Sequence, residues 1–300
     1  MPYLRGGNDE LFKEGNPVEI QIGYRDNLET LFKGEITGLE PEFPNGDPPI
    51  LVVRGYDRRH RLMRTDKTRS FVNMKDSDVA SQIAGEAGLT PEVEDTQVTL
   101  DYVLQHNQTD LEFLQERARR IGYEVVVSGG SLHFRKRRND RGADLTLTRQ
   151  VELLEFYPRL TTLSQVEEVV VRGWNPKEKK EFVASSKAGD ESSRMGGDAS
   201  GPATVRRAFG GTGGVSVATP VESQAEADQI ARRGYEEMAL RYVSGDGVCI
   251  GQPDLRAGQV VDIQGLGKRF SGSYYVTSTE HTYKRSIGYR TAFSARRNST

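Results

Sequence analysis

Few side chains in this sequence have both the type and the spacing that catalysis or metal binding requires. The histidines are the first candidates, because imidazole is a common metal ligand and a common general base. None lies in a His-x-x-x-His or Glu-x-x-His pattern, which would place two ligands on one face of a helix. We interpret each as a solvated or hydrogen-bonded structural residue and assign no metal site: His60, His106, His133 and His281.

The sequence also lacks complete motifs for phosphate binding and for a serine or cysteine nucleophile. The glycine run Gly210–Gly214 lacks the Gly-Lys-Ser/Thr of a P-loop and the G-x-G-x-x-G of a dinucleotide fold, so we interpret it as a flexible loop. No G-x-S-x-G motif of a serine hydrolase is present. Cys249 is the single cysteine and stands between Val248 and Ile250, which predicts a core residue rather than a nucleophile.

Carboxylates are plentiful, so an acid and base pair of the glycosidase type stays open from the sequence alone. The doublets Glu167-Glu168 and Glu236-Glu237 are the obvious candidates. Neighbouring residues point to opposite faces of a strand and do not face each other on a helix, so neither doublet makes a good pair. We assign no catalytic residue and no cofactor, and this inventory favours a structural or assembly role.

Composition narrows the classes of partner. The 300 residues carry 41 basic and 43 acidic side chains, a balance that argues against bulk nucleic-acid binding. No apolar run approaches the roughly 20 residues that cross a bilayer, and Met1–Gly7 lacks the apolar stretch of a signal peptide. A lone cysteine forms no internal disulfide, so we expect synthesis in a reducing cytoplasm, with export by another route left open.

The elements that would position any site begin with a small antiparallel unit over residues 17–56. Residues 17–24 alternate apolar and polar side chains, residues 31–39 supply a partner strand, and residues 50–56 supply a third. The proline-rich stretch 41–49 is predicted to be a loop.

The next stretch, Arg58–Arg69, is basic and contains His60. A phosphate-binding patch is one interpretation. We favour a solvated connector or a polar contact with a partner subunit, because no aromatic stacking platform interleaves the basic residues.

Residues 70–137 predict an α+β insertion. One helix covers residues 76–88 and a second covers residues 109–122, each stopped by a glycine. The second begins with a capping box, in which Thr109 is the N-cap and a glutamate follows three residues later. A Ser-Gly-Gly turn predicts a hairpin over residues 124–134.

The C-terminal half resumes strand character. Strands are predicted over residues 145–147, 153–157, 166–174, 248–250, 260–263, 274–283 and 289–294. Residues 185–214 hold eight glycines, which predicts a long mobile loop, and we hypothesise that residues 184–219 become ordered only against a neighbouring chain. A capping box at Ser223 opens a helix to about residue 242, whose candidate buried side is Ala227, Ile230, Ala231, Met238 and Tyr242.

One short phrase occurs twice. Val-Val-Arg-Gly-Tyr-Asp at Val52–Asp57 recurs as Val-Val-Arg-Gly-Trp-Asn at Val170–Asn175. Both copies are typical of the end of a β-strand. A duplicated β-domain and a chance match both stay open. In a duplicated domain, Trp174 would be a buried anchor of the second copy.

Four segments in order resemble the hub proteins of contractile tails, which are the phage late control gene D family and the hub part of VgrG spikes. The segments are Val53–Leu62 leading into Thr68–Phe71 and the Asp76–Leu89 helix, Asn107–Leu114 through Gly122-Tyr123, Val169–Pro176, and Leu255–Gly258 with Phe270–Thr277. The second is similar to the family's Asp-x-x-Phe-Leu helix, and together they span about residues 17–297.

The resemblance implies a mainly β fold with two related β-barrel (tube-type) domains, a small α/β insertion and one long helix near the C-terminal barrel. The expected boundaries are 1–64 for part of the first barrel, 65–140 for the insertion, 141–183 for strands entering the second barrel, 184–220 for the glycine- and serine-rich loop, and 221–300 for the helix and the rest of the second barrel. Fewer residues precede Pro17 than in the family, so the first barrel is expected to be incomplete or closed by another chain. The OB-fold and needle of VgrG-type members do not follow Thr300. A separate spike protein and a trimmed spike protein both stay open.

The implied function is a structural hub without enzymatic activity, a homotrimeric symmetry adaptor that joins a hexameric tail tube to a trimeric spike. Expected partners are two further copies, a tail-tube initiator protein, a spike protein or the chain's own missing C-terminal spike, inner baseplate proteins and a payload. Neither nucleic-acid sequence recognition nor stable membrane insertion is expected. We expect assembly in the bacterial cytoplasm within a phage tail-like particle, with release from the cell left open; phage, secretion system and extracellular injection system are not distinguished.

Two other functions stay open. A tail-associated cell-wall hydrolase would need two buried carboxylates facing a pocket. A peptidoglycan-binding module would need exposed aromatic residues on a shallow groove. Tyr102 and Tyr123 are the nearest candidates for such a groove, and both are predicted to lie in the core instead.

Overall fold

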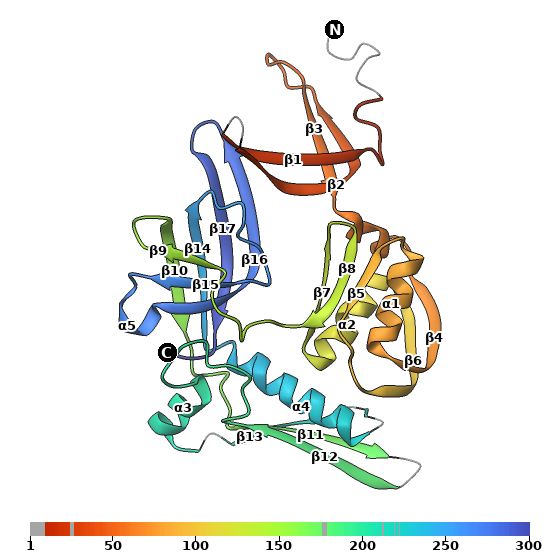
Figure 1. The fold of residues 1–300 in the computed structure, drawn as a ribbon, viewed down its shortest axis with the longest axis vertical. Coiled ribbons are helices and arrows are strands. Elements are labelled where there is room, and N and C mark those ends of the chain that lie inside the picture. Colours follow the sequence, from red (N-terminus) through yellow and green to blue (C-terminus); the bar gives the residue numbers. More distant parts are fainter. Residues whose placement is uncertain (1–9, 25–26, 176–178, 212, 219, 222) are drawn as a thin grey trace. The chain divides into compact units, whose positions relative to one another are not determined.

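The computed structural model describes residues 10–24, 27–175, 179–211, 213–218, 220–221 and 223–300 (Figure 1). Strands hold 48% of the residues and helices 21%, which confirms the predicted mainly β fold with an α+β insertion and a long helix. The chain divides into two compact units. The first consists of Met1–Gln97, Tyr102–Glu116 and Glu124–Arg135, and the second of Val98–Asp101, Arg117–Tyr123 and Lys136–Thr300.

The first unit begins with the predicted three-stranded antiparallel sheet. Its strands, in spatial order, are β1 (Pro17–Tyr24), β2 (Asn27–Glu42) and β3 (Ile50–Tyr56). β2 runs to Glu42, so the loop expected from Pro41 begins only after that residue. Of the described residues in these strands, Ile36 is the one buried hydrophobic side chain, and Ile20 is 51% exposed. The sheet therefore has almost no core of its own.

The α+β insertion follows, and its predicted helices and hairpin are confirmed. Its elements are the 3-10 helix η1 (Arg58–Met63), β4 (Lys67–Lys75), α1 (Asp76–Glu86), β5 (Thr90–Val93), β6 (Thr99–Gln108), α2 (Asp110–Ile121), β7 (Tyr123–Ser128) and β8 (Ser131–Lys136). β4 pairs with β6, and β5, β8 and β7 form a second sheet. The glycines that follow the helices, Gly88 and Gly122, have φ angles of +68° and +77°, the left-handed region that glycine adopts without strain.

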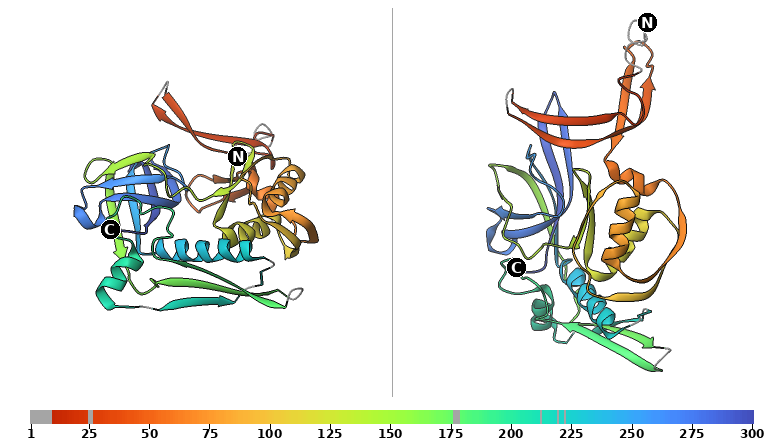
Figure 2. Two further views of the ribbon diagram at one scale, coloured as in Figure 1. Left: turned by 60° about the horizontal axis from the view of Figure 1, so that its bottom comes forward. Right: turned by 45° about the vertical axis from the view of Figure 1, so that its right-hand side comes forward.

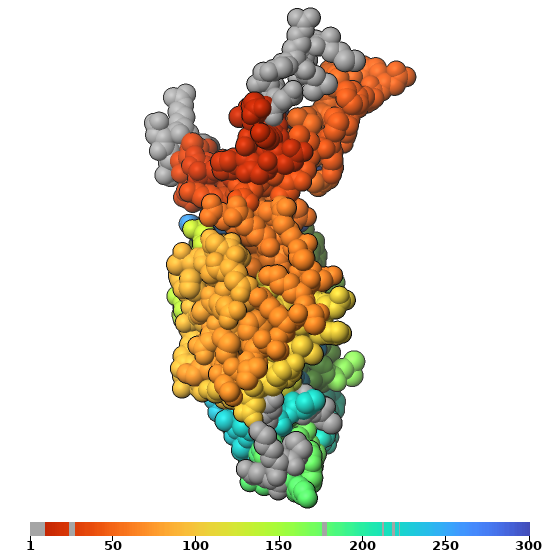
Figure 3. All heavy atoms as spheres, turned by 90° about the vertical axis from the view of Figure 1, so that its right-hand side faces the viewer, coloured from red at the N-terminus to blue at the C-terminus, as the bar shows by residue number. Residues whose placement is uncertain are grey.

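The insertion has a well-formed core, and Figure 3 shows its outer face in orange and yellow. Ile83, Leu114 and Phe134 are fully buried, and Phe113 stacks on the ring of Phe71 with 5.7 Å between ring centres. Tyr123 is buried, as predicted.

The placement of Tyr102 in the core was wrong, because this side chain is 52% exposed on β6. Its neighbour Val103 takes the inward position, and successive residues of a strand point to opposite faces.

The second unit contains a six-stranded sheet that curls into a half barrel (Figures 1 and 2). Its strands are β9 (Leu145–Thr148), β10 (Leu153–Leu160), β14 (Val243–Ile250), β15 (Val260–Gln264), β16 (Gly272–Lys284) and β17 (Gly288–Arg297), with the short helix α5 (Gly267–Phe270) before β16. The spatial order is β10-β14-β17-β16-β15-β9. Each strand predicted for this region is confirmed.

Aromatic side chains fill the concave core of this sheet. Phe156 meets Tyr274 edge-on at 5.4 Å and stacks on Phe293 at 6.0 Å between ring centres. Gly245 and Gly247 on β14 leave room for them. A Cβ atom at Gly245 would lie 2.4 Å from the Phe156 ring, and one at Gly247 would lie 2.6 Å from the Phe293 ring. The two glycines are therefore required by packing.

A smaller sheet and the long helix complete the second unit. The strands are β12 (Lys180–Lys187), β11 (Glu168–Asn175) and β13 (Gly214–Ala218) in spatial order, and the helix is α4 (Gln224–Ala239). Ser223 caps α4 by accepting a hydrogen bond from the backbone N–H of Glu226, as predicted. α4 lies along one face of the sheet, where Val171, Ala227 and Ala231 share a core (Figure 2).

The segment expected to be a long loop contains regular structure, so that expectation was wrong. Helix α3 (Gly201–Phe209) lies within residues 185–214, and β13 begins at Gly214. Met195 packs in a core with Leu240, Val260 and Tyr275. A few well-placed apolar side chains thus give regular structure to a segment whose average composition is poor in them. The hypothesis that a neighbouring chain orders residues 184–219 stays a prediction.

The expectation that Trp174 is a buried anchor was also wrong. Trp174 is 58% exposed. Val169 and Val171 take the inward positions of β11, against α4, so the alternation of the strand places Arg172 and Trp174 on the opposite face.

We predict that Trp174→Ala lowers the free energy of unfolding by less than about 0.5 kcal/mol, because the side chain supports no core. Phe293→Ala, in the core of the same unit, should lower it by about 3–5 kcal/mol. Chemical denaturation followed by circular dichroism measures both. A loss of several kcal/mol in Trp174→Ala would place that side chain in a core.

Candidate functional site

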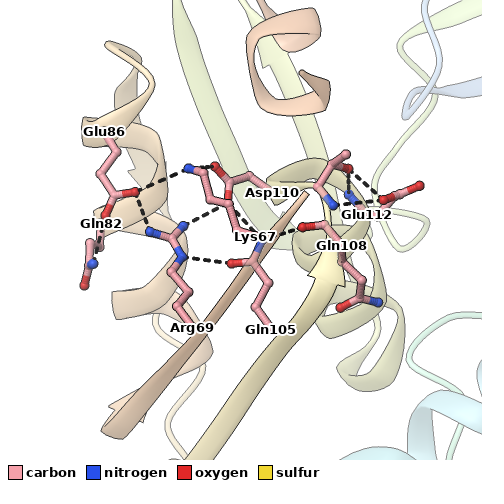
Figure 4. Close-up of polar contacts among 9 residues, drawn as sticks. Lys67, Arg69, Gln82, Glu86, Gln105, Gln108, Asp110 and Glu112 are labelled. Carbon is pink, nitrogen blue, oxygen red and sulfur yellow. Dashed lines mark hydrogen bonds and ion pairs between the residues drawn. The ribbon is translucent and has the colours of Figure 1, made fainter. Parts of the chain in front are cut away.

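A polar cluster in the first unit surrounds Asp110, the first residue of α2 (Figure 4). The buried carboxylate accepts hydrogen bonds from Lys67 Nζ at 2.6 Å, Arg69 Nη2 at 2.8 Å and Gln105 Nε2 at 3.0 Å. Lys67 and Arg69 are two residues apart on β4 and so point to one face of it. The helix dipole further stabilises a negative charge at this position. We call these four residues the Asp110 cluster.

Arg69 extends the Asp110 cluster to α1. Its Nε donates to Gln105 Oε1 at 2.9 Å and its Nη1 donates to Glu86 Oε2 at 2.6 Å, while the guanidinium lies 5.1 Å from the centre of the Phe71 ring. Hydrogen bonds from Gln82, and then from Arg69, lower the pKa of Glu86. One arginine side chain therefore connects β4, β6, α1 and α2.

The chemistry available to the Asp110 cluster is structural. Both carboxylate oxygens of Asp110 accept hydrogen bonds from cations, so removing a proton from a substrate there would require breaking those bonds. Beside it, Thr109 and Glu112 form the predicted capping box, with Glu112 N–H donating to Thr109 Oγ1 at 3.2 Å. The sequence analysis included Asp110 as the Asp of the Asp-x-x-Phe-Leu helix but gave it no role, although an acidic residue directly after an N-cap was an available signal.

A second carboxylate, that of Glu35 on β2, forms hydrogen bonds and ion pairs with basic side chains of η1. His60 Nε2 lies 2.9 Å from Glu35 Oε2, Arg61 Nε donates to the same oxygen at 3.1 Å, and Arg58 Nε lies 3.7 Å from Oε1. The hydrogen bond from Arg61 lowers the pKa of Glu35 against the opposing effect of burial, and His60 lowers it further.

These two clusters revise the interpretation of the basic stretch Arg58–Arg69. Its cations meet carboxylates that are far away in sequence but adjacent in space, and His60 and Leu62 are buried. Most residues of the stretch are nevertheless exposed to solvent, so it is a connector whose cations are paired within the chain. The engaged carboxylates also oppose a phosphate at the same cations.

The second unit has a comparable centre at Glu237 on α4. Its carboxylate oxygens form ion pairs with guanidinium nitrogens of four arginines. The N···O distances are 2.8 Å to Arg137, 3.1 Å to Arg296, 3.2 Å to Arg233 and 3.5 Å to Arg241. Burial alone would raise the pKa of Glu237, but the positive charges of Arg233, Arg137 and Arg296 outweigh burial and lower it. The doublet Glu236-Glu237 thus supplies an ion-pair centre rather than an acid and base pair.

The remaining histidines lie apart from one another and do not form a cluster. His133 Nδ1 lies 3.2 Å from Glu92, His281 Nδ1 lies 2.8 Å from the hydroxyl of Tyr289, and His106 is exposed. Burial lowers the pKa of His281. Across the described ranges, no group of three or more His, Cys, Asp or Glu side chains could hold a metal ion.

The other candidates from the sequence lie apart from these clusters. Cys249 is fully buried in β14, and burial raises the pKa of its thiol to about 12, so the thiol stays protonated. The doublet Glu167-Glu168 stands at the start of β11. In the glycine run, Thr212 lies outside the described residues and Gly214 begins β13. Among the helices that the structure describes, none is long and apolar enough to span a membrane.

A family model decides the family of the chain. The model of the Alg8 N-terminal domain matches residues 4–285, which is nearly the whole sequence. The chain belongs to the Alg8 N-terminal domain family. A search of curated proteins found no match to this chain.

Solved structures of the same fold come from bacteriophage tails and a secretion system. The 43 kDa tail protein of prophage MuSo2 from Shewanella oneidensis has 13% identity and a TM-score of 0.67, over 95% of this Alg8-family chain and 82% of its own. A tail protein from Neisseria meningitidis MC58 has 12% identity and a TM-score of 0.67, over 95% and 84%. An Escherichia coli component of the type VI secretion system, itself similar to phage T4 gp27 and gp5, has 14% identity and a TM-score of 0.61, over 94% and 64%. At these identities the likeness shows a shared fold.

We predict that Asp110→Asn lowers the free energy of unfolding by about 3 kcal/mol, because it removes the charge that Lys67 and Arg69 are arranged around. The matched control is Glu181→Gln, which removes the exposed partner of Arg172 and should lower it by less than about 1 kcal/mol. Denaturant titration checks both variants. Equal losses of unfolding free energy in the two variants would mean that the buried Asp110 cluster stabilises the protein no more than an exposed ion pair does.

We predict a pH-dependent effect for Glu237→Gln. The folded pKa of Glu237 is lowered from its usual value of 4.5, so its contribution is present above that value and is lost as pH falls through the folded pKa. The stability difference between wild type and variant should be about 3 kcal/mol at pH 7 and should shrink below about pH 4.5. Glu236→Gln, the same change one residue earlier on α4, is the control. A difference that stays constant down to pH 2 would contradict this assignment.

Proposed function

We propose that this protein is the structural central hub of a baseplate in a contractile tail or injection system. The observation that carries the proposal is the fold match to tail proteins over 95% of the chain at a TM-score of 0.67. The ordered sequence motifs that resemble late control gene D and VgrG-type hubs support it independently. The charged clusters add a third support, because they connect secondary-structure elements to one another and leave their carboxylates engaged by cations.

In this proposal three copies form a ring that adapts a hexameric tail tube to a trimeric spike. The partners are a tail-tube initiator protein, a spike protein or a spike domain of the same polypeptide, inner baseplate proteins and a payload. The particle assembles in the bacterial cytoplasm. The protein has no enzymatic role in this assembly.

The domain division stays a prediction within this proposal. Residues 1–64 would contribute part of a first barrel, and the three strands β1–β3 are the part that the structure describes. Residues 65–140 would form the insertion. Residues 141–183 and 221–300 would contribute the second barrel. The curled six-stranded sheet supports this for the strands within 145–160 and 243–297, whereas β11 and β12 lie in a separate sheet with β13.

The wall-binding alternative is weakened by one observation. It needs exposed aromatic residues on a shallow groove, and of the two nearest candidates, Tyr102 and Tyr123, the second is buried. Exposure of Tyr102 alone does not make a stacking platform for a sugar chain.

The test is native mass spectrometry of the purified chain, alone and with the tail-tube and spike proteins encoded beside it. The expected result is three times the chain mass, and a complex with a spike trimer and a tube ring. A stable monomer that binds neither protein would contradict the hub assignment and direct the work to assays of cell-wall binding and hydrolysis.

A further inference from the structure

The loop that connects β14 to β15 in the second unit is attached to the hairpin of β16 and β17 through one histidine. This half-buried residue, His281 on β16, lies directly opposite Thr291 on β17. One of its ring nitrogens, Nε2, faces the loop, and the other, Nδ1, faces side chains of β17. We call residues 251–259 the β14–β15 loop.

Three polar atoms meet on the loop side of the ring. Arg256 Nη1 lies 3.0 Å from His281 Nε2 and 3.1 Å from the backbone oxygen of Leu255, and His281 Nε2 lies 3.1 Å from that same oxygen. An arginine side chain carries only donors, so Nε2 carries no proton in this arrangement and accepts a hydrogen bond from Arg256. The oxygen of Leu255 accepts from the same Arg256 nitrogen.

The proton of the neutral ring is therefore on Nδ1, which donates to the hydroxyl oxygen of Tyr289 at 2.8 Å. Thr291 adds a second attachment, because its Oγ1 accepts a hydrogen bond from the backbone N–H of Gln252 at 3.0 Å. Gly251 adds a third, because a Cβ atom there would overlap the Tyr289 ring. The β14–β15 loop thus lies against a ring whose tautomer Arg256 selects.

The surroundings of the ring disfavour a positive charge on it. Burial, and then the charge of Arg256, lower the pKa of His281, whereas the hydrogen bond to Leu255 raises it. Among the described residues, the charged and titratable groups that face the ring are Arg256 from the loop and Tyr289 from β17. Cys249 on β14 lies one strand further away, and its thiol stays protonated.

We propose that His281 and Arg256 form a proton-operated latch on the β14–β15 loop. When Nε2 takes up a proton from solvent, it becomes a donor that faces another donor at 3.0 Å, and two positive charges then share a half-buried site. The oxygen of Leu255 lies within hydrogen-bond distance of both nitrogens. The protonated ring therefore donates to this oxygen itself, and the Arg256 side chain is released to solvent.

The exchange leaves the backbone of the loop satisfied while it changes the surface of the loop. Leu255 is fully buried, and its oxygen keeps one hydrogen bond in either state, first from Arg256 and then from His281. The loop thus stays anchored, and the guanidinium is the group that moves. Falling pH converts a bound arginine into a free one.

The direction of the pH effect on folding follows from the lowered pKa. The folded pKa of His281 is below its usual value of 6.5, so the unfolded chain binds the proton first. The contribution of His281 to stability is complete above pH 6.5, falls as pH drops from that value to the folded pKa, and is constant below it. One proton changes the folding equilibrium constant by at most about tenfold per pH unit.

The experiment follows the full chain by NMR between pH 8 and pH 5, with ¹⁵N in its histidine and arginine side chains. The signals of His281 and Arg256 are assigned through their own backbone amides, so the measurement on the wild-type chain depends on no variant. The variants are Arg256→Ala and His281→Gln. The matched control is Arg285→Ala, which removes an exposed arginine in the turn between β16 and β17.

At pH 8 the proton of His281 should be on Nδ1. As pH falls, the Arg256 guanidinium signal should move to the position of a free arginine, with the same midpoint as the titration of His281. Arg256→Ala should raise the pKa of His281, because it removes the neighbouring positive charge, and Arg285→Ala should leave it unchanged.

Three results would overturn the latch. The first is a proton on Nε2 at pH 8, because Arg256 does not donate to a protonated nitrogen. The second is an Arg256 signal that stays constant while His281 titrates. The third is an equal His281 pKa in wild type and Arg256→Ala.

Denaturant titration between pH 8 and pH 5 gives an independent measurement. The folding equilibrium constant of the wild type should fall more steeply below pH 6.5 than that of His281→Gln, by up to about tenfold per pH unit. Parallel pH profiles of the two proteins would show that His281 binds its proton equally in the folded and unfolded chain, which contradicts the latch.

Discussion

The largely covered carboxylate of Glu237, whose side chain is 15% exposed, is the constraint on which the second unit depends. A lone carboxylate with this little exposure would be strongly destabilising, so cations must be brought to it. They come from three places along the chain: Arg137 between β8 and β9, Arg233 and Arg241 on and just after α4, and Arg296 on β17. Arg137 also lies 5.6 Å from the centre of the Tyr275 ring on β16. One anion thus fixes the long helix against the six-stranded sheet.

The same principle operates in the first unit on a smaller scale. Asp110 and Glu35 each form ion pairs with cations that are distant in sequence, and together they bind several cations of the basic stretch Arg58–Arg69. A stretch that looks like a binding surface in sequence therefore forms ion pairs within its own unit.

The sequence predicted local structure well and tertiary placement less well. The strand over residues 17–24 and the capping boxes at Thr109 and Ser223 follow from local signals, and the structure reproduces them. The exposure of Trp174 depends on which face of β11 is covered by α4, more than fifty residues later in the chain, so residue type alone misled. The partners of Asp110 and Glu237 depend on contacts across similar separations. The segment around α3 was misread because average composition hides a few decisive apolar positions such as Met195.

The sheet β1-β2-β3 has a consequence for the energetics of the free chain. With Ile36 as the one buried hydrophobic side chain among its described residues, it resembles an isolated sheet, which is marginally stable in water. Its opening free energy is accordingly small beside that of the insertion, and its backbone amides exchange hydrogen through local opening rather than global unfolding. Any partner that covers this sheet therefore does two things at once: it binds, and it completes a folding step that the chain alone leaves close to balance.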